Sequence, residues 1–254
     1  MSPLVVRAAA AASLMLLWMG LEALFPRRRL TWPRARRWPS NLGLVALDQI
    51  VVRLLPITPV AWAAAWSGGL LAHVDLPGED LLAVIALDAA IWLQHVMFHR
   101  VPWLWRLHRV HHSDPDYDVT TALRFHPVEI VLSVGVKLGV VTLLGPSPAA
   151  VLTFEVLLNG MAMFNHANLR LPDRLDAMLR LALVTPDVHR VHHSVLDREK
   201  HSNFGFNLSI WDRLFGTWVE QPQGGHEGMR IGDEAFPGEV ELGAMLAEPG
   251  RRAA

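Results

Sequence analysis

The spacing of the histidines is the feature of this chain with the clearest chemical meaning. An H-x-x-x-H pair and two H-x-x-H-H boxes, both with Arg-Val inside, are formed by His95, His99, His108, His111, His112, His189, His192 and His193. Residues three and four apart share a helix face, so the rings of one box can reach one ion. Imidazole suits Fe, Zn, Cu and Ni. Eight rings exceed the ligands of one tetrahedral or octahedral ion, so the boxes predict two metal ions.

Two more histidines adjoin this set. His166 lies in an Asn-His-Ala-Asn stretch and is a ninth candidate ligand, and His126, before a proline, is a tenth. His201 and His226 belong to no box and are not expected to bind metal. The chain has no cysteine, which excludes thiolate ligands, disulfides and cysteine-bound iron–sulfur clusters.

Polar side chains near the boxes could hold the rings in place. A ligating imidazole usually donates its second N–H to a carboxylate, a carbonyl or water. The best candidates for this role are Asp88, two helical turns before His95, together with Asn165 and Asp187. Further acids that equally suit solvated loops are Asp114, Asp116 and Asp197. Beyond the metal ligands themselves, no catalytic residue is expected.

Composition indicates a membrane protein. Hydrophobic residues make up 52% of the 254 residues and charged residues 19%, and mean hydropathy is +0.26. Tryptophan outnumbers tyrosine ten to one, which fits a lipid–water boundary, where Trp103 and Trp105 suit anchors. The formal charge of 23 − 24 = −1 provides no strong field for a polyanion, so no nucleic-acid partner is expected.

Five apolar stretches could cross a bilayer, and they cover residues 8–25, 54–72, 81–98, 128–144 and 148–164. The last two contain charged residues, so the expected number is four to five spans. The basic segments at 27–41, at 100–127 and after 167 fall on one side, which the positive-inside rule places in the cytoplasm. The sequence therefore predicts an all-α, integral membrane helical bundle with a histidine-rich helical cap on its cytoplasmic face.

Two segments after the last span have their own patterns. Residues 175–183 repeat apolar side chains at helical spacing, which suits a helix lying on the membrane surface or one packed on a soluble core. Residues 203–218 are expected to cap the site, with Trp211 and Phe215 against the membrane and Asp212 paired with Arg213.

The boxes and their surroundings resemble the membrane-bound fatty acid hydroxylase and sterol desaturase superfamily over about residues 81–218. The stretches that carry the resemblance are HVMFH (95–99), LHRVHH (107–112), RFHPVE (124–129), FNHAN (164–168), TPDVHRVHH (185–193) and NFGFNLSIWDRLFGTW (203–218). The resemblance implies a non-haem di-iron centre that uses O2 and electrons from an external donor to oxidise an unactivated C–H bond of a lipid. It assigns ligand roles to the eight box histidines and His166, with His126 as a further candidate.

The resemblance also sets the expected organisation. Residues 1–80 would form an N-terminal transmembrane region, 81–220 the hydroxylase-like domain and 221–254 a loosely ordered tail. The chain lacks a cytochrome b5-like extension and a G-x-G-x-x-G nucleotide motif, so electrons would come from a ferredoxin or a cytochrome b5-type donor. The basic residues expected to meet an acidic donor are Arg106, Arg109, Arg190 and Arg198.

Other functions remain open from the sequence. A zinc-dependent membrane hydrolase would need a water-activating Glu, but no H-E-x-x-H occurs. A histidine-rich metal transporter would place its ligands near the bilayer midplane. Within the lipid-oxidising hypothesis, the substrate could be sterol-like, a hopanoid, a carotenoid or a fatty acyl chain, and the product could carry a hydroxyl group or a new double bond. The membrane would be a bacterial inner membrane or an endoplasmic reticulum.

Overall fold

The computed structural model describes residues 3–71, 77–236 and 240–251, and in these ranges helices and isolated β-bridges are the regular structure. The long helices are α1 (Pro3–Leu24), α2 (Arg34–Leu54), α4 (Glu79–Arg100), α6 (Pro127–Leu144) and α7 (Pro148–His166). The shorter ones are α3 (Pro59–Ala65), α5 (Pro102–His112), η1 (Val119–Leu123), α8 (Asp173–Leu179), α9 (Pro186–His192), α10 (Asp197–Lys200), α11 (Ile210–Leu214), α12 (Gly225–Gly228), α13 (Leu242–Ala247) and η2 (Glu248–Gly250). The expected all-α class is confirmed.

A common signal starts several of these helices. The hydroxyls of Thr58, Ser147 and Thr185 each accept a hydrogen bond from a backbone N–H of the first turn of α3, α7 and α9. In each case a proline follows directly, where its fixed φ angle suits the first helical position and its missing N–H costs nothing. The Ser/Thr-Pro pairs thus define where α7 and α9 begin to present their histidines.

Three stretches of the described chain are long and apolar enough to cross a membrane: Arg34–Ala65, Glu79–Arg100 and Pro127–Leu144. The expected spans at 81–98 and 128–144 correspond to α4 and α6, and the stretch at 148–164 is helical as α7. In α1 the apolar part, Ala9–Leu24, is shorter than those three.

The expected bounds of the second span, residues 54–72, are wrong. The stretch that is long and apolar enough to cross begins at Arg34, about twenty residues earlier, and ends at Ala65, and a break at residues 55–58 separates α2 from α3. Arg37, which suggested an exposed basic loop, is fully buried, and its guanidinium donates to Asp114 at 2.6 and 2.8 Å. A paired arginine can lie inside a helix bundle, which its charge alone does not indicate. Residue 72 lies outside the described ranges.

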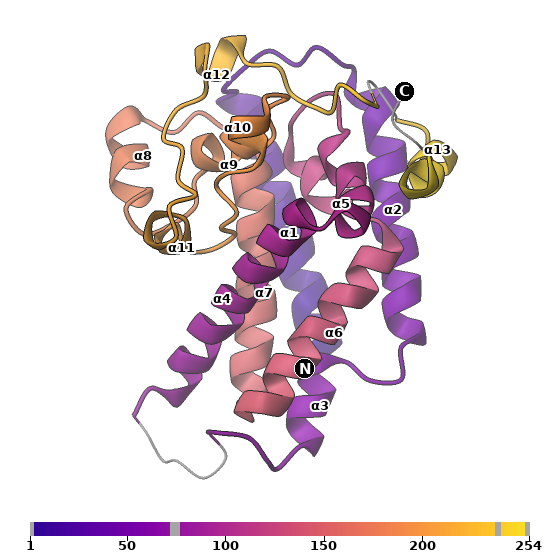
Figure 1. Ribbon diagram of the computed structural model, residues 1–254, viewed down its shortest axis with the longest axis vertical. Helices are drawn as coiled ribbons and strands as arrows, with labels where there is room; N and C mark the ends of the chain where they lie inside the picture. Colours follow the sequence, from indigo (N-terminus) through magenta and orange to yellow (C-terminus); the bar gives the residue numbers. More distant parts are fainter. Residues whose placement is uncertain (1–2, 72–76, 237–239, 252–254) are drawn as a thin grey trace.

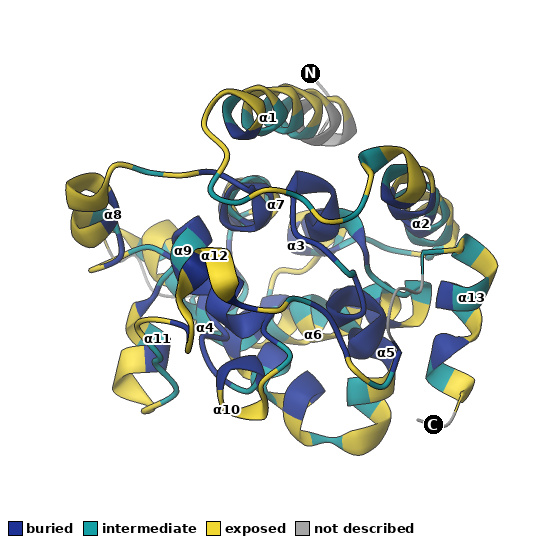
Figure 2. Cartoon of the chain, turned by 90° about the horizontal axis from the view of Figure 1, so that it is seen from above, coloured by how far each residue is buried: buried dark blue, intermediate teal, exposed yellow. Residues whose placement is uncertain are grey.

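The bundle has two distinct ends (Figure 1). At one end, the segment after α3 meets the end of α6, where Leu70 N–H donates to Leu143 O at 2.9 Å. Gly145 has a φ of 64°, and a Cβ there would lie 2.1 Å from Gly68 O, so only glycine allows this approach. The other end gathers α5, α9, α10 and α12 (Figure 1), and seen from above, the buried residues of α5 and α9 lie inside a rim of partly exposed helices (Figure 2).

Residues 240–251 pack against α2 and α5, whereas the sequence predicted a loosely ordered tail at 221–254. Met245 of α13 is fully buried against Leu44 and Val110. The carboxylate of Glu248 is also buried, and it accepts from Arg109 Nε at 3.2 Å and Ser113 Oγ at 2.9 Å. Both donors are at the end of α5, so the tail fixes the helix that carries one histidine box.

Candidate metal centre

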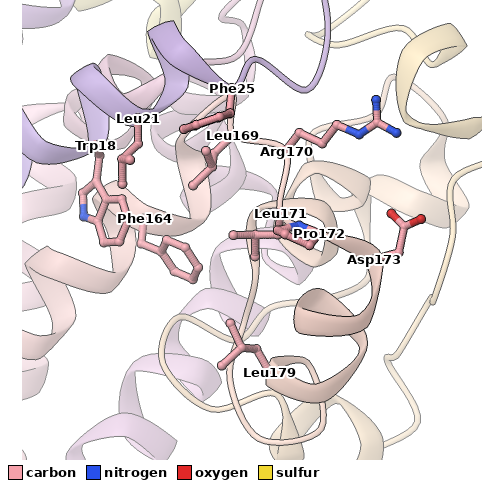
Figure 3. A pocket seen from close by; sticks show the side chains of 10 residues that line it. All are labelled: Trp18, Leu21, Phe25, Phe164, Leu169, Arg170, Leu171, Pro172, Asp173 and Leu179. Atoms are coloured by element: carbon pink, nitrogen blue, oxygen red, sulfur yellow. The ribbon is translucent and has the colours of Figure 1, made fainter.

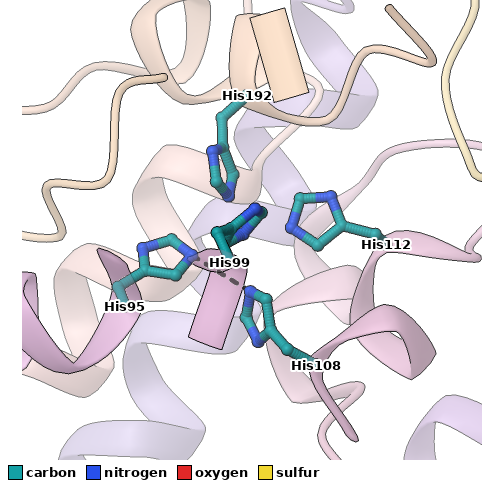
Figure 4. A group of neighbouring side chains, drawn as sticks. All are labelled: His95, His99, His108, His112 and His192. Carbon is teal, nitrogen blue, oxygen red and sulfur yellow. Dashed lines mark hydrogen bonds between the residues drawn. The ribbon is translucent and has the colours of Figure 1, made fainter. Parts of the chain in front are cut away.

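Nine histidines meet in two adjoining groups at the end of the bundle that carries α5 and α9. The five-histidine group contains His95, His99, His108, His112 and His192, and the four-histidine group contains His111, His166, His189 and His193. Within each group, one nitrogen of every ring lies within 4.8 Å of the others. Figure 4 shows the rings of the larger group pointing toward one another. All nine side chains are buried.

The two H-x-x-H-H boxes each supply both groups. In α5, His108 and His112 belong to the five-histidine group, whereas His111 belongs to the four-histidine group. The box at α9 does the reverse, because His189 and His193 join the smaller group and His192 the larger. Helical geometry explains the split, since residues four apart are neighbours on one face. The sequence prediction had placed all three rings of a box on a single face, and this is corrected.

Backbone carbonyls fix the tautomers of two rings in the five-histidine group. His95 Nδ1 lies 2.7 Å from Phe204 O, and His192 Nδ1 lies 2.6 Å from Ser202 O. A carbonyl can only accept, so each Nδ1 carries the hydrogen and each Nε2 presents a lone pair. His192 Nε2 is buried and has no hydrogen-bond partner among the described residues. This is the arrangement in which metal-ligating histidines are usually held.

A carboxylate holds a third ring of this group. His108 Nδ1 lies 2.7 Å from Glu129 Oε1, and His108 Nε2 faces His95 Nε2 at 3.0 Å (dashed line in Figure 4). With Glu129 ionised, both Nε2 atoms carry lone pairs, which repel each other unless a cation lies between them. Two nitrogens, each ~2.1 Å from an ion and at right angles, are about 3.0 Å apart, so the spacing fits a shared metal ion.

The four-histidine group has a similar construction. His166 Nδ1 lies 2.6 Å from Ala162 O, and its Nε2 is 3.0 Å from His111 Nε2 and 3.1 Å from His189 Nε2. Both ring nitrogens of His193 are buried without a hydrogen-bond partner among the described residues. Buried polar atoms are rarely left unsatisfied, so these nitrogens indicate a ligand.

Burial keeps the imidazoles of α5 and α9 neutral. It lowers the pKa of His108 to about 3 and the pKa values of His189 and His193 well below 6.5, and the neighbouring histidines lower the latter two further. A neutral ring offers its lone pair to a cation at physiological pH. Nine neutral nitrogens would leave the full positive charge on the bound ions.

Three side chains near the rings were not assigned from the sequence. Glu129 is the carboxylate at His108, although it was not among the acids expected to hold a ring. His201, which had been set aside, places its Nδ1 3.2 Å from His99 Nδ1. The ring of Trp105, proposed as a membrane anchor, lies 4.9 Å from His99 and 5.3 Å from His112. For Glu129 the sequence did offer a signal, because this acid follows the candidate ligand His126 by three residues. We found no such signal for His201 or Trp105.

The loop at residues 202–204 supplies both carbonyl acceptors of the five-histidine group. Asn203 has a φ of 50°, in the left-handed region, and its amide donates to Val188 O at 2.9 Å and Val219 O at 2.8 Å. This conformation lets the flanking carbonyls of Ser202 and Phe204 reach rings from two different helices. Strained backbone of this kind tends to occur where function requires it.

Residues 205–212 are anchored to α4 by two buried carboxylates. Asp212 accepts from Phe204 N–H at 2.8 Å and Trp92 Nε1 at 3.0 Å. The expected pairing of Asp212 with Arg213 is wrong, because the guanidinium of Arg213 lies over the Trp218 ring and donates to Arg180 O. Arg213 is thus held by an aromatic face instead of a carboxylate.

Asp88 anchors the same loop. It accepts from Asn207 Nδ2 and Trp211 Nε1, both at 2.8 Å. Asp88 thus holds the segment 203–218 in place by these two hydrogen bonds. Among the described residues, no hydrogen bond joins Asp88 to a candidate ligand ring. Trp211 points its indole nitrogen to Asp88, whereas Phe215 is 59% exposed, so only the phenylalanine is available to a membrane.

The other two orienting candidates also bond to groups other than the rings. Asn165 donates to Phe206 O at 2.8 Å, and its own carbonyl accepts from Tyr117 Oη at 2.6 Å. Asp187 binds Arg27 and Arg190, and although burial opposes ionisation, Arg190, His226 and Arg27 lower its pKa. These residues hold the backbone around the site.

The loop acids fall into two kinds. Asp114 and Asp116 are buried; the first binds Arg37, and the second accepts from Trp32 N–H at 3.0 Å. Asp197 is exposed.

His126 lies outside both groups. Its Nδ1 accepts from Val128 N–H at 3.2 Å, so it caps α6. Of the basic residues expected to meet an electron donor, Arg109 and Arg190 are buried, whereas Arg106 and Arg198 are exposed. An acidic partner could therefore reach only the last two.

Comparison with known proteins gives a consistent result. The family model described as "Fatty acid hydroxylase" matches residues 81–217, more than half of the chain. The chain is 29% identical to ornithine lipid hydroxylase OlsE of Rhizobium tropici, covering 67% of this chain and 50% of that protein. It is 30% identical to alkylglycerol monooxygenase of Xenopus tropicalis (72% and 42% covered) and 29% identical to human cholesterol 25-hydroxylase (73% and 68%). The chain thus spans about half the length of the first two relatives. No solved structure matches.

Proposed function

Because this chain belongs to the fatty acid hydroxylase family, we propose that it is a membrane-bound, metal-dependent oxygenase that uses O2 to hydroxylate or desaturate a C–H bond of a membrane lipid. Its similarity to three enzymes whose names state hydroxylation or monooxygenation of lipids supports this proposal. The single observation that carries it is the set of nine buried imidazoles in two groups.

We infer that two iron ions occupy the two groups. The five-histidine group would hold one and the four-histidine group the other, through the same nine histidines to which the sequence resemblance assigns ligand roles. Iron accepts imidazole ligands readily, and no side chain can itself supply an oxidant for an alkyl C–H bond, so bound iron would supply that oxidising power. The unpartnered Nε2 of His192 and the facing Nε2 atoms of His95 and His108 fit this assignment.

The protein's own part is to orient ligands and exclude water. Glu129 and the carbonyls of Ser202, Phe204 and Ala162 hold the Nδ1–H groups, which directs Nε2 inward. Rings that cover the groups, including Phe125 stacked on His111 at 4.5 Å, keep bulk water away. In the overall hydroxylation, a C–H bond, O2, two electrons and two protons give an alcohol and water.

The electrons would come from an external donor of the ferredoxin or cytochrome b5 type. We place the site on the cytoplasmic face of the membrane, as the positive-inside rule predicts for the basic segments. The half-buried Trp105 and His201 both contact His99, so they connect the five-histidine group with the surface.

The other hypotheses find less support. A hydrolase needs a free base near the metal, but Glu129 is engaged with His108. A transporter would need its ligands along a path near mid-membrane, whereas both groups lie at one end of the bundle. His126 is omitted as a ligand because it caps α6.

The test compares wild type with His192→Ala, after anaerobic purification from iron-supplied cells. Mössbauer spectroscopy should detect about two irons per chain, which change spectrum with O2. With a reductant and a membrane lipid extract, wild type should give a lipid product heavier by one oxygen or lighter by two hydrogens. His192→Ala should lose iron and product while still inserting into membranes.

His126→Asn is the matched control, because asparagine preserves the capping acceptor of α6. It should retain iron and turnover. Unchanged turnover in His192→Ala, or tightly bound zinc that does not react with O2 after iron loading, would contradict the proposal.

A further inference from the structure

A groove of about 660 Å³ lies beside the metal centre, between α1 and α8 (Figure 3). Its volume is in the range of small-molecule sites. The walls are apolar and come from four parts of the chain, and the residues that define them are Trp18, Leu21, Phe164, Leu169, Leu171 and Leu179. Arg170 and Asp173 lie at the edge, and their charged ends point away from the apolar side chains (Figure 3).

The groove opens onto a surface suited to lipid. On one side Leu24 is 72% exposed and Phe25 57%, and on the other Met178 is 61% and Leu181 69% exposed. Isolated apolar residues are common on surfaces, but two apolar strips flanking an apolar groove are typical of a membrane contact. The sequence left α8 open as a membrane-surface helix or one packed on a soluble core, and the membrane-surface placement would put the groove at the depth where headgroups meet acyl chains.

One wall of the groove is built from the same segment that carries a candidate ligand, His166. Phe164 and His166 are two residues apart on α7, with Phe164 facing the groove and His166 in the four-histidine group. The Trp18 ring packs on Phe164 with centroids 4.8 Å apart. Leu169, in the groove wall, packs with Ala167, the residue directly after His166. A chain held in this groove would therefore lie against the backbone that positions a ligand.

We propose that this groove binds the hydrocarbon chain of a bilayer lipid substrate, with the anionic group of its headgroup at Arg170. That the bound lipid is a substrate rests on the proposed function, whereas lipid binding by the groove does not. The apolar walls match a hydrocarbon chain, and the continuity with the exposed apolar strips indicates that the lipid enters from the bilayer. The guanidinium of Arg170 matches a phosphate or carboxylate at the headgroup.

The test uses the full chain in nanodiscs of phosphatidylethanolamine and phosphatidylglycerol that contain a phospholipid with a mid-chain diazirine. After irradiation, mass spectrometry should find labels on residues 18–25 and 164–179. Leu171→Trp, which fills the groove, should lower labelling there and kcat/KM by about tenfold, with iron content unchanged. Leu21→Trp fills the groove from the opposite wall and should lower labelling and kcat/KM in the same way. It replaces Leu171→Trp in the test if that variant does not fold.

Ala177→Trp is the matched control, because Ala177 is exposed on α8, does not line the groove and belongs to neither apolar strip. It should leave labelling and turnover unchanged. Labels outside the groove, with full turnover in both filled variants, would overturn the inference while the proposed function stands. Labels in the groove, with no O2-dependent product from iron-loaded wild type, would support lipid binding and overturn the proposed function.

Discussion

The Nε2 atoms of His95 and His108 face each other at 3.0 Å, while acceptors occupy the Nδ1 side of both rings. The pair therefore has no hydrogen left to share between the facing nitrogens when Glu129 is ionised. Removing a metal ion from such a pair should leave either two lone pairs in repulsion inside a buried site or an added proton, which would let His108 Nε2 donate to His95 Nε2. The folded state without metal is expected to be less stable for this reason.

Metal removal should thus lower the melting temperature. An ion that binds only the folded chain, at a thousand times its Kd, stabilises it by about 4 kcal/mol, or about 10 °C for a chain of this size. The measurement is thermal unfolding in detergent before and after chelation, followed by iron addition. Equal melting temperatures in all three samples would show that the groups do not bind iron in the folded protein.

Replacement of Glu129 should weaken metal binding by loosening His108. Glu129→Leu removes the acceptor at 2.7 Å and should raise the Kd for iron by about 10–100-fold, whereas Glu129→Gln keeps an acceptor oxygen and should have a smaller effect. Competition with a chelator of known affinity measures this. Glu227, which is 73% exposed, provides the control Glu227→Gln. If Glu129→Leu binds iron like wild type, the carboxylate does not support the site.

His201 should position His99 although it is no ligand itself. His99 Nε2 is buried without a partner among the described residues, so a metal there requires the hydrogen on Nδ1, which then donates to His201 Nδ1 at 3.2 Å. His201→Phe should lower the iron affinity of the centre about tenfold through a changed five-histidine group, and His201→Gln should restore part of it. Mössbauer spectra would show one altered iron of two. Two unaltered irons in His201→Phe would refute the role.

The C-terminal segment should contribute strongly to stability through Glu248. Glu248→Ala leaves the guanidinium of Arg109 buried without its carboxylate, which should lower the free energy of unfolding by about 3 kcal/mol. The exposed pair of Glu234 and Arg230 offers a control, because Glu234→Ala should cost less than about 1 kcal/mol. Denaturant titration in detergent compares the two. Similar losses in the free energy of unfolding for the two variants would mean that the buried pair stabilises the fold no more than the exposed pair.

Local spacing made much of the site predictable. The separation of His108 from His112 and of His189 from His193 is one helical turn, so the sequence alone indicates shared faces. The relation between boxes was not predictable in this way, because it depends on how α4, α5, α7 and α9 pack. Metal binding by these rings itself remains a proposal.

Contacts between distant segments account for what the sequence did not show. Glu129 and His108 are 21 residues apart, and His201 and His99 are 102 apart, so no local pattern links them. The start of α2 was hidden for a related reason. Arg37 reads as a loop residue until Asp114, 77 residues later, is seen to neutralise it.

The exchange of rings between the two boxes has a consequence for assembly. His111 of α5 completes the group to which α9 gives two rings, and His192 of α9 completes the group to which α5 gives two. Neither coordination sphere can close until both helices have docked, and undocking either helix opens both. For the two ions proposed above, loading should therefore be cooperative: chains with one ion should be scarce at every iron concentration, and a titration should show apo and doubly loaded protein in coexistence.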